Sequence, residues 1–140
     1  YLDKKYSPKY IFDIATLTWA QIVALWNKIS AVIWKNTILN QKIQKISWDI
    51  KERVWELPFY KPYIKAYKSQ IADISNYFPS STTPWTVNAA LFLWEFVDNK
   101  NWVHFDIAGP SWNFSWEDEF FWSWSSGFWL RLFLSIVDLL

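Results

Sequence analysis

Cysteine and methionine are absent from this sequence of 140 residues, and glycine occurs only twice. Without cysteine the chain can form neither disulfides nor thiolate metal sites, and the absence fits a reducing compartment. Two glycines are few for a domain of this size, because turns with positive φ normally use glycine. The chain also begins at Tyr1 rather than at a methionine. We therefore expect it to be part of a longer gene product.

An excess of charge of one sign is lacking as well, since 14 basic and 13 acidic side chains leave a net charge of +1. This balance gives no reason to expect nucleic acid or an anionic membrane as a partner. The most apolar stretches, residues 11–34 and 128–140, are interrupted by charged or polar side chains. Neither supplies the ~20 apolar residues of a membrane helix, and no signal peptide is recognisable.

What the sequence does contain is an alternation of strand-like and helix-like segments. β-branched and aromatic residues predict strands at residues 9–16, 28–35 and 102–108. Apolar spacing and capping residues predict helices at residues 18–25, 37–50, 60–69, 86–97 and 127–140. Asn36 or Thr37 is the expected cap of the second helix, and Thr86 that of the fourth. The order predicts an α/β fold, a three-layer α/β/α sandwich with a mixed, mostly parallel sheet.

Five segments, in this order, resemble motifs of the catalytic domain of the cytosolic leucyl aminopeptidases, a family that uses two metals. They are YIFDIATLTWA, RVWELPFYKPYIKAYKSQIADISN, PWTVNAALFLWEFV, WVHFDIAGPSW and SSGFWLRLFLSIV. The resemblance covers essentially the whole chain. It implies that residues 1–140 are the C-terminal portion of that catalytic domain.

The resemblance implies an enzyme that removes N-terminal residues from peptides with two divalent metal ions, zinc or manganese. In the family, the metal ligands and the catalytic arginine surround an N-T-D-A-E-G-R motif, which would lie upstream of Tyr1 and has no match here. We therefore expect no catalytic or metal-binding residue in this chain, and no activity from the chain alone. The resemblance also implies a cytoplasmic protein that acts on peptide substrates and forms a homo-hexamer at full length.

What this chain would supply is the substrate side of the site. In the family, the T-L-T-G turn after a strand and the I-A-G-x-x stretch line the pocket for the substrate. The matching residues are Thr16, Leu17, Thr18, Trp19, Ala108 and Ser111. Without the resemblance, Thr16–Thr18 would be interpreted as an ordinary strand end.

The 13 tryptophans are unusual, and six of them stand where the family pattern has or accepts glycine: Trp19, Trp26, Trp34, Trp85, Trp124 and Trp129. An indole at such a position is expected to overpack its surroundings. One explanation is a UGA codon that the source reads as glycine and this sequence renders as tryptophan. The alternative is a diverged protein that is truly rich in tryptophan. Trp55, Trp102 and Trp112, by contrast, fall where the family itself has tryptophan.

Other groups of polar residues have weaker claims to function. His104 and Asp106 would share one face of a strand, as an acid/base pair or as structural residues. Asp13 lies in an apolar strand, where a buried, hydrogen-bonded structural role is expected. The acidic run 117–119 is either a cation site or a solvated loop. Finally, Lys61, Lys65 and Lys68 form a phosphate-binding patch or an ordinary surface helix.

Two alternatives to an enzyme fragment remain open. The first is a non-catalytic binding module whose exposed tryptophans stack on sugars or bases. Most tryptophans lie in apolar or turn-like segments, which does not favour it. The second is a structural or interaction role at a subunit interface. In that case the isolated fragment would expose sheet edge and apolar patches and would aggregate.

Overall fold

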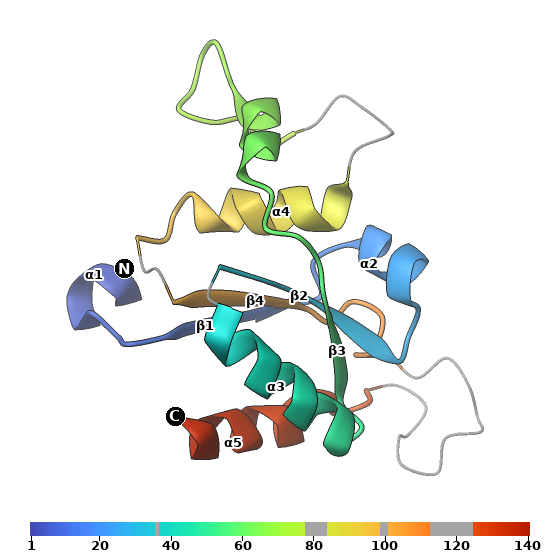
Figure 1. The fold of residues 1–140 in the computed structure, drawn as a ribbon. Helices are drawn as coiled ribbons and strands as arrows, with labels where there is room; N and C mark the ends of the chain where they lie inside the picture. The colour runs from blue at the N-terminus through green and yellow to red at the C-terminus, as the bar shows by residue number, and fades with distance from the viewer. Residues whose placement is uncertain (36, 78–83, 99–100, 113–124) are drawn as a thin grey trace.

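The computed structural model describes residues 1–35, 37–77, 84–98, 101–112 and 125–140. The elements are α1 (Leu2–Tyr6), β1 (Ile11–Ala15), α2 (Trp19–Leu25), β2 (Ile29–Trp34), α3 (Thr37–Asp49), β3 (Arg53–Glu56), the 3₁₀ helix η1 (Lys61–Tyr67), α4 (Trp85–Trp94), β4 (Trp102–Asp106) and α5 (Leu130–Leu139). Figure 1 shows α2 and α4 on one face of the sheet and α3 and α5 on the other. This is the predicted three-layer arrangement.

The sheet has four strands in the order β1-β4-β2-β3. β1 pairs with β4 in parallel, and β2 pairs with β3 in parallel, whereas β2 and β4 are antiparallel. A mixed, mostly parallel sheet was predicted and is confirmed. The parallel register places Ala15 opposite Asp106, so the carboxyl ends of β1 and β4 meet at one edge of the sheet.

Each face of the sheet carries its own apolar cluster. The cluster beneath α3 and α5 contains Val32, Val103 and Phe105 from the strands and Ile43 and Leu132 from the helices. The opposite cluster, beneath α4, is smaller and centres on Ile33, Ala90 and Trp102. Burial on both faces explains why β2 and β4 read as nearly continuous apolar runs.

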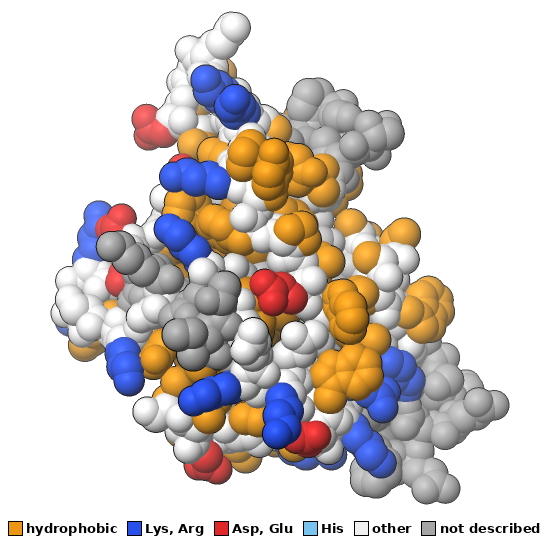
Figure 2. All heavy atoms as spheres, viewed as in Figure 1, with side chains coloured by type: hydrophobic (Ala, Val, Ile, Leu, Met, Phe, Trp, Pro, Cys, Tyr) orange, Lys and Arg blue, Asp and Glu red, His pale blue; other side chains and the backbone are white. Residues whose placement is uncertain are grey.

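The outer surface of the α4 layer is partly apolar. Figure 2 shows hydrophobic side chains gathered over η1 and α4, with lysines beside them. Tyr60 and Tyr63 contribute there, at 51% and 39% exposure. No helix among the described residues is both long and apolar enough to cross a membrane.

Several local predictions need correction. β3 was not predicted, because a strand of four residues is too short for a periodic pattern to appear. The helix predicted at residues 60–69 is a 3₁₀ helix limited to Lys61–Tyr67, with Pro62 near its start, and α5 begins only at Leu130. Thr86 does not cap α4: the helix begins at Trp85 after Pro84, and Thr86 lies inside it. Asn36, the other candidate for a helix cap, lies outside the described residues.

Candidate functional site

The turn that follows β1 is held by one buried carboxylate, that of Asp106 at the end of β4. Oδ1 of Asp106 accepts hydrogen bonds from the N–H of Leu17 at 3.0 Å and of Ala108 at 3.1 Å. Oδ2 accepts one from the Thr18 hydroxyl at 2.7 Å. Asp106 is fully buried, so its charge depends on these three donors. The carboxylate therefore fixes the turn after β1 to the loop after β4.

Thr18 connects the same turn to two helices. Its hydroxyl accepts a hydrogen bond from the N–H of Gln21 at 3.2 Å and thereby caps the amino end of α2. The same oxygen lies 2.9 Å from the hydroxyl of Thr86 in α4. Because the Thr18 proton goes to Asp106, Thr86 is the donor in that pair. All three partners of Thr18 are buried residues.

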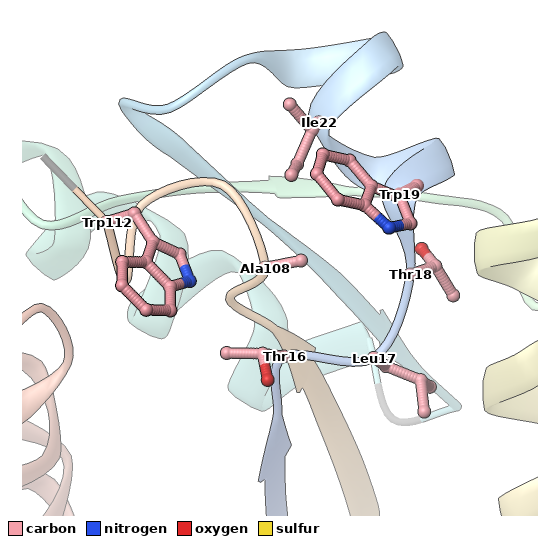
Figure 3. A pocket seen from close by; sticks show the side chains of 7 residues that line it. All are labelled: Thr16, Leu17, Thr18, Trp19, Ile22, Ala108 and Trp112. Carbon is pink, nitrogen blue, oxygen red and sulfur yellow. The ribbon is translucent and has the colours of Figure 1, made fainter. Parts of the chain in front are cut away.

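A pocket of about 370 Å³ opens beside this turn. Figure 3 shows Ala108 between the indoles of Trp19 and Trp112, which stand on opposite sides. The lining residues are Thr16, Leu17, Thr18, Trp19, Ile22, Ala108 and Trp112. The structure thus brings five of the six predicted substrate-binding residues to one pocket. Whether they bind a substrate stays a prediction.

The sixth predicted residue, Ser111, is not among the lining residues. Its hydroxyl donates to the Ala108 carbonyl at 3.2 Å and its N–H to the Ile107 carbonyl at 3.0 Å. Ser111 therefore shapes the loop that carries Ala108. Ile22 and Trp112, which do line the pocket, were not predicted as site residues. Ile22 lies four residues after Thr18 on a helix, and that spacing could have indicated a shared face.

The side chain of Gln21 holds the loop after β4 in place. It is fully buried, its Nε2 donates to the Ile29 carbonyl at 2.7 Å, and its Oε1 accepts from the N–H of Gly109 at 2.6 Å. One side chain thus joins α2, β2 and the loop that carries Ala108. Sequence reasoning missed it, because a lone glutamine in an apolar helix gives no pattern to recognise. Its isolation among apolar neighbours is the one available signal.

His104 and Asp106 do not form the acid/base pair that was considered. Both carboxylate oxygens of Asp106 are used by the turn after β1. His104 is fully buried, stacks on Trp102 at a centroid distance of 5.9 Å, and has Nδ1 3.3 Å from Oδ2 of Asp13. Neither ring nitrogen makes a hydrogen bond to a described residue. Asp13 was expected to be buried, but its side chain is 29% exposed.

The part of the chain that the structure describes offers no metal centre among the remaining candidates. Within the described ranges, no group of three or more His, Cys, Asp or Glu side chains is placed to hold a metal ion. The acidic run 117–119 lies outside the described residues. Lys61, Lys65 and Lys68 line an open hollow, and the Lys61 ammonium lies 5.1 Å from the centre of the Trp94 ring. Whether these lysines bind phosphate or form an ordinary surface helix is not tested by the structure.

The tryptophans are more exposed than the sequence suggested. Five of those described are exposed: Trp19, Trp26, Trp48, Trp55 and Trp112. Trp19 is 79% exposed, so the overpacking expected at this position is wrong. Trp34 and Trp129, in contrast, are nearly fully buried, and Trp85 is half-buried. Trp124 lies outside the described residues. Among these exposed indoles, Trp48 and Trp55 contact each other edge to face, with ring centroids 6.4 Å apart.

The fold and the pocket define a class: an α/β protein with a pocket at the carboxyl ends of neighbouring parallel strands, where such folds commonly bind ligands. Residues 1–134 match the model of the cytosol aminopeptidase family, catalytic domain, and the chain belongs to this family. The resemblance found in the five motifs is thereby confirmed.

Individual relatives agree with this assignment. A probable cytosol aminopeptidase of Thermosynechococcus vestitus is 46% identical over 102 residues, which are 73% of this chain and 20% of the relative. One from Chlorobium luteolum is 43% identical over 112 residues, 79% of this chain and 22% of the relative. One from Rhodopseudomonas palustris is 36% identical over 137 residues, 98% of this chain and 27% of the relative. The chain thus spans about a fifth to a quarter of these relatives.

Proposed function

We propose that this chain forms the substrate-pocket side of a metallo-aminopeptidase that removes N-terminal residues of the leucine type from peptides. The observation that carries the proposal is the pocket beside the turn at Thr16–Thr18, together with membership of the cytosol aminopeptidase family. Leu17, Ile22 and Ala108 give the pocket an apolar lining that suits an aliphatic side chain.

The backbone of the turn would orient the substrate. The N–H groups of Leu17 and Ala108 are both used by Asp106. The first N–H groups of a helix have no partner within it, and they point out from its amino end. Residue 19 is the first of α2 and lines the pocket. Its N–H is therefore our candidate donor to a substrate carbonyl.

The metal half of the site is proposed for the part of the protein outside this chain. Two zinc or manganese ions would supply a hydroxide near neutral pH. The family's metal-binding motif would lie in that other part, so we assign no residue of this chain to the metals and none to catalysis. Without that other part we expect the chain to be inactive.

Assembly and location are also proposals. Leu130, Phe133, Leu134 and Val137 form an exposed apolar stripe along α5. A stripe of this kind supports the view that this part of the chain packs against other protein surfaces. We propose a cytoplasmic homo-hexamer as the full-length form, with peptides as substrates and with neither nucleic acid nor membrane as a partner.

The test is the activity of the full-length protein on peptides with leucine at a free amino terminus. We expect hydrolysis that needs a divalent metal and that stops when the amino group is acetylated. Ala108→Phe fills the pocket and should lower kcat/KM for leucyl substrates about tenfold or more, with a smaller effect on glycyl substrates. Val23→Phe adds the same ring on the solvent side of α2, where Val23 is 87% exposed, and is the matched control.

Equal losses for leucyl and glycyl substrates with Ala108→Phe would contradict the assignment of this pocket to the first side chain. Absence of metal-dependent hydrolysis from the unsubstituted full-length protein would contradict the proposed function itself. A non-catalytic binding module would then be the better description.

A further inference from the structure

Trp26, which ends α2, has a backbone conformation that belongs to glycine. Its φ is 59° and its ψ is −153°. In this region the β-carbon of any other residue collides with its own backbone, so that glycine alone occupies it readily. The indole is 63% exposed, and its burial therefore does little to hold the residue in this conformation.

Neighbouring residues, and not the Trp26 indole, hold the backbone in this conformation. Gly109 lies against the residue 26 carbonyl so closely that a β-carbon on Gly109 would overlap the oxygen. The amide of Gln21 reaches the same carbonyl at 3.5 Å and also accepts from the N–H of Gly109. Two backbone segments therefore meet here at a distance that only glycine permits at position 109. The peptide of residue 26 cannot turn away without breaking this contact.

Trp129, just before α5, is also a tryptophan with a positive φ, but its side chain is buried. Its φ is 93° and its ψ is −20°, two residues after Gly127 with φ 62°. A positive φ is rare for a bulky residue. The Trp129 indole packs against Phe105 and Phe133, and its Nε1–H is buried without a hydrogen-bond partner among the described residues. At this position the backbone is thus strained, and the indole N–H is unpaired among the described residues.

Trp34, at the end of β2, shares only the second defect. It is 2% exposed, and its Nε1–H is also buried with no hydrogen-bond partner in the described part of the chain. Trp102 is equally buried but has an ordinary strand conformation, and its indole nitrogen is not among the buried unpaired atoms. Ser7 and Lys51 also have positive φ. They are a small and a flexible polar residue next to helix ends, where the left-handed conformation is commonly accepted.

We propose that residues 26 and 129 are glycine in the protein that the source organism makes, because one codon that it reads as glycine has been rendered here as tryptophan. The same codon then accounts for Trp19, Trp34 and Trp85, which match glycine positions of the family pattern although their backbone does not require glycine. The defects at residues 26, 34 and 129 all fall on positions of this set. Tryptophans outside it, Trp55 and Trp102, are true tryptophans.

The proposal changes the pocket. Trp19 is one of its walls (Figure 3), and with glycine at position 19 that wall is missing. The N–H of residue 19 then meets the pocket without an indole beside it. Position 19 thus becomes a determinant of how large a first side chain the site accepts. This consequence rests on the proposed function, whereas the identity of the residues does not.

The experiment is peptide mass spectrometry of the protein isolated from its source, after cleavage with trypsin. Three fragments decide the matter: residues 10–28 contain Trp19 and Trp26, residues 29–35 contain Trp34, and residues 54–65 contain Trp55. We expect the masses and fragment spectra of the first two to show glycine at 19, 26 and 34. The third is the internal control and should retain tryptophan at 55.

Tryptophan at position 26 would overturn the proposal, and so would glycine at position 55, because the substitution would then not follow the glycine positions. Codons give a second, independent reading: UGA at 26, 34 and 129 with UGG at 55 and 102 supports the proposal, and UGG at 26 and 129 refutes it. Neither readout depends on enzymatic activity. Failure of this proposal therefore leaves the proposed function standing, and the reverse holds as well.

Discussion

The turn around Asp106 and the corners at Trp26 and Trp129 differ in how well their residues fit the local backbone and hydrogen bonding. At the turn, three donors converge on one buried carboxylate, and the backbone after β1 needs no unusual conformation. At the two corners, tryptophan has a positive φ, and at Trp129 a buried indole N–H is unpaired as well.

The difference shows which parts of this sequence agree with its own fold. In natural proteins local preferences and the global fold support one another, and conflicts concentrate where function requires them. A functional site is where a protein tolerates such conflicts, yet neither Trp26 nor Trp129 lines the pocket. A change in the identity of those residues explains this distribution better than a functional strain does.

Removing the carboxylate that organises the turn should have the largest effect. Asp106→Ala leaves the Leu17 and Ala108 N–H groups without an acceptor, and we expect a loss of about 3–5 kcal/mol in the free energy of unfolding. Asp106→Asn keeps one acceptor oxygen and should cost about 1–3 kcal/mol. Urea unfolding of the full-length protein measures both.

Asp138→Ala is the surface control, because Asp138 is exposed. It should change the stability by no more than about 0.5 kcal/mol. A loss below about 1 kcal/mol for Asp106→Ala would mean that the turn does not depend on this carboxylate.

Trp102 and Trp129 form a matched pair of buried indoles. Trp102→Gly should cost about 3–5 kcal/mol, because it empties a well-packed position. Trp129→Gly creates a similar cavity but relieves the positive φ and the unpaired N–H, each worth about 1–3 kcal/mol. We therefore expect the loss at position 129 to be smaller by about 2 kcal/mol or more. Equal losses in thermal or urea unfolding would contradict the account of Trp129.

Much of the fold was predictable from the sequence because its central elements have strong patterns. Leu39, Ile43, Ile46 and Ile50 face the core from α3 and the residue after it, as their spacing predicted. The strands β1, β2 and β4 were predicted within one or two residues at most ends. β3 was missed for lack of length, and Thr86 was misjudged because its hydroxyl pairs with Thr18 across 68 residues.

The site was predictable only through the resemblance, and then only in part. Composition gave no reason to favour Thr16–Thr18 over any other strand end. Asp106 was noticed for its neighbour His104, whereas its partners come from a turn about 90 residues earlier. Gln21 and Trp112 depend on tertiary contacts that no spacing reveals. Local patterns report the face of an element, not the long-range pairing of polar groups.

The buried hydroxyl of Tyr67, which packs against α4, should make a smaller contribution to stability, and one that depends on pH. It donates a hydrogen bond to the Asn88 carbonyl, and burial raises the pKa of Tyr67 above its ordinary value of 10.0. The unfolded chain then loses its proton first, so stability is fully present below that value and falls as the pH rises towards the raised pKa of the folded state. The slope in that interval is at most about 1.4 kcal/mol per pH unit.

Tyr67→Phe removes this titration. Urea midpoints of the full-length protein between neutral and strongly alkaline pH should therefore fall less steeply for the variant than for the unsubstituted protein. Parallel pH profiles would show that Tyr67 does not contribute. At neutral pH the variant should be less stable by about 1 kcal/mol, because the hydrogen bond to Asn88 is lost.

The comparison between turn and corners is tested most directly at residue 26, where the side chain is exposed and the backbone alone is at issue. Trp26→Gly and Trp26→Ala both remove the indole, but only glycine accepts the observed φ and ψ without strain. Urea unfolding of the two full-length variants should show glycine more stable than alanine by about 1 kcal/mol or more. An alanine variant as stable as the glycine variant would contradict the account.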